Sequence, residues 1–266
     1  MPHTGAGALA IFAILINSPL MMIAGAVGGL GGTLVGRYVM APQSYQEGLA
    51  GFNGVLLGIA SAILLEPSAL AFLFVFLGGA VCAYSFNWGM KRNLPLLTTH
   101  YICIMLLMWL LLPTLAQPNG GYQIHWPDSF FISAIVTGVG QMGFQGNLIS
   151  SVLLLIGLYL GDGWRAINWA LIGSLFGVLL GLLAGMDQQT MAVGFAGYNG
   201  ALIAVALTSV SGHRMRSWQP WVGICIAVSL TLLGLHLALT PVLTMPFVLA
   251  MWTVIAIERL KAHTNP

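Results

Sequence analysis

Nearly all of this sequence is arranged in long apolar stretches that only Pro, Gly and a few charged residues interrupt. Only 5% of the 266 residues are charged, whereas a water-soluble domain carries about 25%. Six acidic and eight basic side chains cannot cover the water-facing surface of such a chain. We therefore expect an integral membrane protein embedded in a lipid bilayer, and a net charge of +2 gives no indication of nucleic-acid binding.

The apolar stretches have the lengths of membrane-spanning helices, since each crossing needs roughly 17 to 25 mostly apolar residues. The breaks predict an all-α, polytopic fold with crossings at residues 19–39, 48–65, 68–88, 94–113, 147–160, 165–185, 191–210, 219–238 and 243–258. When the chain is followed through these crossings, all eight Lys and Arg residues fall on one side. The positive-inside rule assigns that side to the cytoplasm. This predicts a multi-pass protein of the cytoplasmic membrane with a cytoplasmic C-terminus and an outward loop at 115–130.

Short motifs of the first half recur in the second half at an offset of 146 residues, the separation of Asn53 from Asn199. The paired motifs are GFNGVLLGIA (51–60) with GYNGALIAVA (197–206), and LPLLTTHY (94–101) with TPVLTMPF (240–247). The predicted crossings of the two copies run in opposite directions. The sequence therefore predicts two inverted-topology repeats around a central pore, at residues 1–120 and 121–266.

Paired proline and threonine residues stand inside these apolar motifs: Pro95 and Thr98 match Pro241 and Thr244. Proline breaks the helical hydrogen-bond ladder. Non-helical backbone at membrane depth is tolerated only where it is buried in protein or lines a wet cavity. The pairing favours hydroxyls that face a central path, although a Thr in a helix often bonds a carbonyl of its own helix instead.

A third motif opens the second half. The stretch GVGQMGFQGN, residues 138–147, places Gln141, Phe144 and Gln145 within one helical turn. A short amphipathic stretch of this kind is typical of a re-entrant half-helix, whose Gln carbonyl can accept hydrogen bonds from a solute and whose Phe ring can bound a slot. An interfacial turn with solvated amides is the alternative that the spacing leaves open.

Together these motifs resemble those of the urea transporter family. The stretch LTPVLTMPF resembles that family's Leu-Pro-x-x-Thr-x-Pro-Phe signature, and LPLLTTHY resembles its weaker first copy. The elements GFNG and GYNG resemble the family's repeated Gly-aromatic-Asn element, and GQMGFQGN resembles the Gln-x-x-Phe entry of its pore helix. The resemblance covers roughly residues 17–258.

The resemblance implies a passive, channel-type transporter for urea, assembled as a homotrimer in which each protomer holds its own pore. It implies that urea passes edgewise through an aromatic slot beside a row of hydrogen-bond acceptors. By the same resemblance, Thr98 and Thr244 are the paired threonines of that row, and Gln141 supplies its second-half amide. The slot walls implied by the resemblance are Phe144, Phe52, Tyr198 and Leu56, with Leu202 as the repeat partner of Leu56.

The first half departs from the family pattern at its start. In FAILINSP, residues 12–19, Phe12 stands where the family has a Gln, and Leu15 stands at the Phe position. In addition, 36 residues separate Asn17 from Asn53, whereas 52 residues separate the matching asparagines of the second half. The first half is therefore expected to lack about one short helix and one side-chain member of the acceptor row.

A further departure is His100, which stands where the second copy has Pro246. One interpretation is a histidine bonded to a backbone carbonyl. The other is a pH-sensitive gate, because histidine titrates near neutral pH.

The distribution of charge favours passive transport over pumping. Charged residues lie only near the ends of the predicted crossings or in loops, and uphill transport usually needs titratable groups within them. Because Phe12 replaces the expected Gln, a passive channel for another small neutral solute, such as ammonia or a short amide, is the alternative to urea. No nucleotide loop, redox motif or nucleophile–base constellation is found in the sequence, so no cofactor or metal is expected, and a membrane-embedded enzyme is the more remote alternative.

Overall fold

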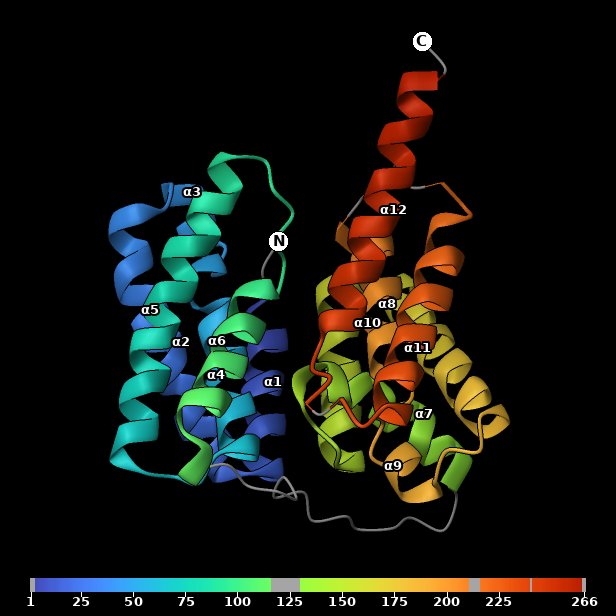
Figure 1. The fold of residues 1–266 in the computed structure, drawn as a ribbon, viewed down its shortest axis with the longest axis horizontal. Coiled ribbons are helices and arrows are strands. Elements are labelled where there is room, and N and C mark those ends of the chain that lie inside the picture. The colour runs from blue at the N-terminus through green and yellow to red at the C-terminus, as the bar shows by residue number, and fades with distance from the viewer. Residues whose placement is uncertain (1–2, 116–129, 211–215, 240, 265–266) are drawn as a thin grey trace. The chain divides into compact units, whose positions relative to one another are not determined.

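The computed structural model describes residues 3–115, 130–210, 216–239 and 241–264, and these contain helices and turns but no strand (Figure 1). The predicted all-α class is therefore confirmed. The described chain forms two compact units. Unit 1 comprises residues 14–115, and unit 2 comprises residues 3–13 together with all described residues from 130 onward. The predicted division into repeats 1–120 and 121–266 follows sequence offset rather than contacts, and it stays a prediction.

Two helices of unit 1, α2 (Pro19–Val39) and α5 (Ala69–Lys91), each begin directly after a serine that caps the helix. The unit also holds α3 (Pro42–Gln46), α4 (Leu49–Leu64), α6 (Thr99–Leu111) and the short turn η1 (Pro113–Leu115). The Ser18 hydroxyl accepts a hydrogen bond from the Met21 N–H at 3.3 Å, and the Ser68 hydroxyl accepts one from Ala71 at 3.1 Å. Such caps satisfy amide groups that the first helical turn leaves without partners.

Unit 1 is built around α2, which packs closely against both α4 and α5. A Cβ atom added at Gly28 would overlap the carbonyl oxygen of Gly54 on α4, so only glycine permits this approach. Residues further along α2 meet earlier residues of α4 but later residues of α5, so α2 is antiparallel to α4 and parallel to α5. The parallel pairing carries the C-terminal ends of α2 and α5 to the same end of the unit.

Unit 2 repeats this plan with one additional helical segment. It holds the start of α1 (Thr4–Asn17), α7 (Phe130–Gly140), η2 (Gln141–Gly143), α8 (Leu148–Leu183), α9 (Gln188–Ala192), α10 (Tyr198–Val205), η3 (Ala206–Val210), α11 (Gln219–His236) and α12 (Met245–Thr264). The close contact between α8 and α10 again depends on glycine, because a Cβ atom at Gly173 would overlap the carbonyl oxygen of Gly200. This contact corresponds to the one between α2 and α4 in unit 1.

The two crossings predicted at 147–160 and 165–185 correspond to the two helical parts of α8, which meet at a kink. The one non-helical position of α8 is Gly163, with φ 74° and ψ −169°. A side chain disfavours this backbone conformation, which explains why a glycine stands there. At the offset of 146 residues, the part of α8 before Gly163 falls mostly on α1, and the missing short helix of the first half stays a prediction.

Several elements of the two units match at the offset of 146 residues. The short helix α3 corresponds residue for residue to α9, and α6 begins at the position that corresponds to the start of α12. These matches lie inside each unit and do not depend on how the units are placed. The inversion of one repeat relative to the other stays a prediction.

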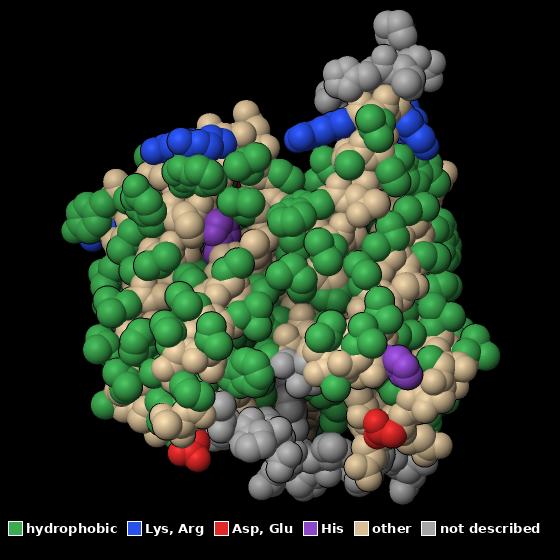
Figure 2. Space-filling view, in the orientation of Figure 1, with side chains coloured by type: hydrophobic (Ala, Val, Ile, Leu, Met, Phe, Trp, Pro, Cys, Tyr) green, Lys and Arg blue, Asp and Glu red, His purple; other side chains and the backbone are tan. Residues whose placement is uncertain are grey.

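The described helices have the composition of a membrane-embedded protein. Four of them, α2, α5, α8 and α11, are long and apolar enough to cross a bilayer. Hydrophobic side chains cover most of the visible face of each unit (Figure 2). Among the described residues, none of the buried side chains is an Asp, Glu, Lys or Arg. These observations confirm a multi-pass membrane protein.

The glycine contact between α2 and α4 generates a prediction about stability. Gly28→Ala is expected to destabilise the protein by about 1–3 kcal/mol, because the new methyl group meets backbone that no rotamer change can move. Thermal unfolding in detergent measures this change. Gly7→Ala on α1 is the matched control, since a Cβ atom there has open space around it. Equal unfolding temperatures for the two variants would contradict the proposed packing.

Candidate functional site

The backbone just before α6 is not helical, although it lies between apolar helices. Residues 94–96, which include Pro95, have no regular secondary structure, residues 97–98 form a turn, and α6 begins only at Thr99. Leu97 has a positive φ of 51°, a conformation that residues with a side chain rarely adopt. Thr98 follows directly and is buried, and its carbonyl oxygen accepts the first helical hydrogen bond from Ile102 at 3.3 Å.

Unit 2 contains the same turn before α12. Leu243 has a φ of 49°, and Thr244 follows it as a buried residue. The Thr244 carbonyl oxygen accepts a hydrogen bond from Val248 at 3.1 Å, which corresponds to the bond between Thr98 and Ile102. The predicted non-helical backbone at the Pro–Thr motifs is therefore observed in each unit. Each turn presents its threonine at the start of a helix.

An asparagine on a neighbouring helix holds each turn in place. The Asn53 side-chain amide on α4 donates to the Leu97 carbonyl oxygen at 3.2 Å, and the Asn199 amide on α10 donates to the Leu243 carbonyl oxygen at 3.3 Å. The sequence shows these asparagines as a repeated pair, but it does not show which carbonyl each one binds. They are positioning residues, because they fix the backbone conformation that places Thr98 and Thr244.

The turn in unit 2 has more hydrogen-bond donors than the turn in unit 1. The Tyr198 hydroxyl also donates to the Leu243 carbonyl oxygen, and the Asn199 amide also donates to the Thr231 hydroxyl at 3.0 Å. In unit 1 the residue that corresponds to Tyr198 is Phe52, which has no hydroxyl. Phe52 is 47% exposed, whereas Tyr198 is only 5% exposed. The two aromatic residues of the repeated motif therefore occupy different environments.

Apart from Phe144, which directly follows η2, the predicted wall residues lie on the same helices as the asparagines. Phe52 and Leu56 are on α4, which packs against α6, and Leu202 is on α10, which packs against α12. Both leucines are half-buried. Each unit therefore brings these wall residues to the helix that contacts its own threonine turn.

The stretch around Gln141 lies at the end of the short helix α7, and the re-entrant half-helix expected there stays a prediction. The helix α7 ends at Gly140, Gln141 begins η2, and Phe144 has a left-handed φ of 63°. Gln141 is buried, and Phe144 is half-buried. Gln141 begins η2 and Thr244 directly precedes α12, and both η2 and α12 pack against α10, which carries Tyr198.

His100 makes a different contact from the backbone bond expected for it. Its Nδ1 lies 2.8 Å from the Ser85 hydroxyl oxygen, which itself donates to the Val81 carbonyl oxygen at 2.7 Å. Because the hydroxyl proton is used in that bond, the imidazole Nδ1–H is the donor to Ser85. The Phe86 ring meets the imidazole edge-on, at a centroid distance of 5.6 Å. Within the described chain, His100 Nε2 is buried without a hydrogen-bond partner.

Comparison with known proteins now identifies the family. The sequence model of the family described as urea transporter matches residues 1–259 of this chain. The chain belongs to the urea transporter family. The family is one of transporters, and the fold has the membrane-length helices that such a protein requires.

Individual relatives agree with this assignment. Urea transporter 1 of Ovis aries is 28% identical over 145 residues, which cover 51% of this chain and 36% of the sheep protein. Urea transporter 1 of Mus musculus is 31% identical over 133 residues, which cover 46% of this chain and 33% of the mouse protein. The chain therefore matches about a third of the length of these relatives.

The asparagine contacts generate a prediction about the two turns. Asn199→Leu is expected to destabilise the protein by about 1–3 kcal/mol, because the Leu243 carbonyl oxygen and the Thr231 hydroxyl each lose a buried donor. Asn53→Leu removes one donor and is expected to destabilise it less. Thermal unfolding of purified protein compares the variants, with the exposed Asn168→Leu as control. A smaller effect for Asn199→Leu than for Asn53→Leu would contradict these roles.

Proposed function

We propose that the protein is a passive, channel-type transporter for urea. The observation that supports this most directly is the repeated turn, in which a buried threonine follows a leucine of positive φ whose carbonyl oxygen accepts from an asparagine amide. A transport path needs polar groups at fixed positions inside an apolar protein, and the two turns provide them. Family membership and the names of the relatives indicate urea as the solute.

The chemistry of urea fits such a path. Urea is flat and neutral and has four N–H donors, and removing its water without replacement costs several kcal/mol. In the proposal, the hydroxyls of Thr98 and Thr244 and the carbonyl of Gln141 replace the lost hydrogen bonds. The rings of Phe52, Phe144 and Tyr198, with Leu56 and Leu202, form a slot that admits flat molecules. Each contact remains weak, because a channel must release its solute as readily as it binds it.

Transport down a gradient is favoured over pumping. An ion- or proton-coupled transporter usually carries ionisable side chains inside its membrane domain. In the described chain, His100 is the one buried histidine, and its Nδ1 is already bonded to Ser85. This leaves few groups for coupling solute movement to protons.

A second solute class is supported by Phe12. This residue stands where the family has a Gln, and its side chain is 60% exposed on α1 and offers no hydrogen-bonding atom. A path with one fewer acceptor discriminates less strongly in favour of a solute with many donors. Ammonia or a short amide is therefore the alternative solute.

The same proposal includes the membrane arrangement. The positive-inside rule places the basic ends of the helices and the C-terminus in the cytoplasm, and the family resemblance implies a homotrimer with one pore in each protomer. Protease protection of a C-terminal tag in sealed vesicles tests the orientation. Native mass spectrometry, which counts the copies in the assembly, tests the trimer.

Thr98→Val and Thr244→Val should each lower urea flux by roughly 10-fold, the loss that corresponds to one hydrogen bond of about 1.4 kcal/mol. Stopped-flow light scattering of proteoliposomes measures this flux, with formamide and ammonia as comparison solutes. Thr253→Val is the matched control, since Thr253 lies on the exposed side of α12 and bonds the Leu249 carbonyl oxygen of its own helix. Wild-type flux in both Thr98 and Thr244 variants would exclude the threonines from the path.

The variant Phe12→Gln separates the two solute classes. Restoring the missing acceptor is expected to raise the ratio of urea flux to ammonia flux by about 5-fold, the equivalent of a hydrogen bond of about 1 kcal/mol. The same proteoliposome assay measures both fluxes. An unchanged ratio would show that residue 12 does not determine selectivity, and wild-type liposomes that pass ammonia but not urea would favour the alternative solute.

A further inference from the structure

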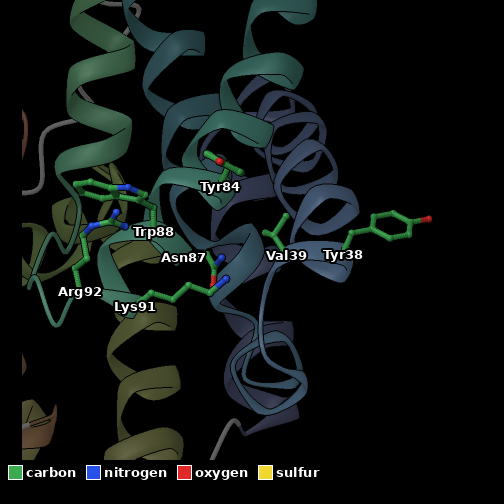
Figure 3. Close-up of a pocket in the computed structure, with 7 residues that line it drawn as sticks. All are labelled: Tyr38, Val39, Tyr84, Asn87, Trp88, Lys91 and Arg92. Carbon is green, nitrogen blue, oxygen red and sulfur yellow. The ribbon is translucent and has the colours of Figure 1, made fainter.

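A surface pocket of about 320 Å³ lies in unit 1 at the C-terminal ends of α2 and α5. Figure 3 shows the residues that line it: Tyr38, Val39, Tyr84, Asn87, Trp88, Lys91 and Arg92. None of them belongs to the proposed solute path. The pocket combines aromatic rings, two cations and one amide, and this combination suggests a ligand with both an apolar part and an anionic part.

The pocket follows from the parallel packing of α2 and α5. Glycines bring the two helices together, as at Gly32, where an added Cβ atom would lie 3.2 Å from the Gly79 carbonyl oxygen. Their last turns therefore reach the same end of unit 1. There Val39 and Asn87 form a floor that is mostly covered, while the larger side chains stand around it and remain exposed.

Asn87 is the feature of this pocket that apolar packing does not explain. The residue is only 6% exposed, yet its side-chain amide lines the pocket and is not among the buried polar groups of the described chain that lack a partner, so the amide atoms stay accessible from the pocket. An amide that stays accessible in this way is available to a ligand, to which it can donate through its NH2 group.

The charge of the pocket is positive and is not neutralised. Lys91 and Arg92 both line it, and no carboxylate among the described residues forms an ion pair with either of them. Glu47, eight residues after Val39, accepts a hydrogen bond from the Gln43 amide. The C-terminus of α5 contributes roughly half a negative charge, which two full positive charges outweigh.

The Arg92 guanidinium is held in a fixed orientation. Its central carbon lies 4.2 Å from the centre of the Trp88 ring, so the planar cation is held against the aromatic face. In Figure 3 the Arg92 side chain lies beside the Trp88 ring, and the Lys91 side chain extends toward Asn87. Stacking uses the face of a guanidinium and leaves its N–H edge for a phosphate oxygen.

The aromatic residues indicate where this pocket lies in the bilayer. Tyr38, Tyr84 and Trp88 are exposed next to basic residues at the end of apolar helices. Tyr and Trp gather at the boundary between hydrocarbon and headgroups, and basic pockets between helices on the cytoplasmic side bind anionic lipid headgroups. We propose that this pocket binds the phosphate of an anionic phospholipid, whose glycerol and upper acyl chains contact Tyr84 and Trp88.

Native mass spectrometry of the detergent-purified full chain tests this proposal with phosphatidylglycerol and phosphatidylcholine at equal concentration. The wild type is expected to retain phosphatidylglycerol preferentially. The double variant Lys91→Gln/Arg92→Gln should reduce that preference by about 10-fold or more, because both phosphate contacts are lost. Asn87→Leu should reduce it by about 5-fold without any change of charge.

The double variant Arg165→Gln/Arg259→Gln is the matched control, because it removes the same net charge from exposed positions in unit 2. An unchanged preference in this control, with a loss in the pocket variants, supports the proposal. An equal loss of the phosphatidylglycerol preference in both double variants would show that overall charge causes it. That result would overturn the proposed lipid site. Thermal unfolding of each variant shows whether a lost lipid preference comes from misfolding. If the Lys91→Gln/Arg92→Gln variant does not fold, Asn87→Leu tests the site instead.

A separate measurement with inorganic phosphate distinguishes the lipid from a soluble anion. The lipid proposal expects millimolar phosphate to leave phosphatidylglycerol retention unchanged, because the acyl chains add contacts that phosphate lacks. Displacement of the lipid by phosphate, together with no preference between the two lipids in nanodiscs, would assign the site to a free anion and overturn the lipid assignment. The inference does not depend on which solute the protein transports.

Discussion

The need to satisfy backbone polar groups where water is absent determines most of this structure. In a bilayer, an N–H or C=O group without a partner costs several kcal/mol, so the chain is helical almost throughout its described length. The exceptions are correspondingly informative. At Leu97 and Leu243 the backbone leaves the helix, and in each case an asparagine amide from an adjacent helix donates a hydrogen bond to the carbonyl oxygen.

Close helix contacts make these exceptions possible. An asparagine side chain is short, so it reaches a carbonyl on another helix only when the helices lie near one another. The glycine contacts of α2 with α4, and of α8 with α10, bring the asparagine-bearing helices into the core of each unit. Glycine therefore has two effects. It permits close packing of the helices, and the short distance that results lets an asparagine side chain reach and position a polar turn.

Much of the fold could be predicted from the sequence, because apolar run length and helix-breaking residues act locally. The predicted crossing 19–39 coincides with α2, and 219–238 nearly coincides with α11. The interruption at Gly163 agrees with the predicted crossings, which end at residue 160 and begin again at 165. The carbonyl partners of Asn53 and Asn199 were beyond sequence reasoning, because they lie 44 residues along the chain. The sequence shows that Tyr198 has a hydroxyl and Phe52 has none. It does not show that this hydroxyl donates to the Leu243 carbonyl oxygen.

The positive φ of Leu97 and Leu243 affects how the proposed path binds a solute. A glycine at either position would adopt this backbone without strain, but it would also move among many conformations. Leucine restricts that freedom, and the asparagine bond holds it in the one conformation observed, at a cost of the order of 1–3 kcal/mol that folding supplies. The turn is therefore already ordered in the folded protein, so solute binding does not have to order it. In the proposed path, such preorganised threonines bind and release a molecule without rearranging, which suits rapid passage more than tight capture.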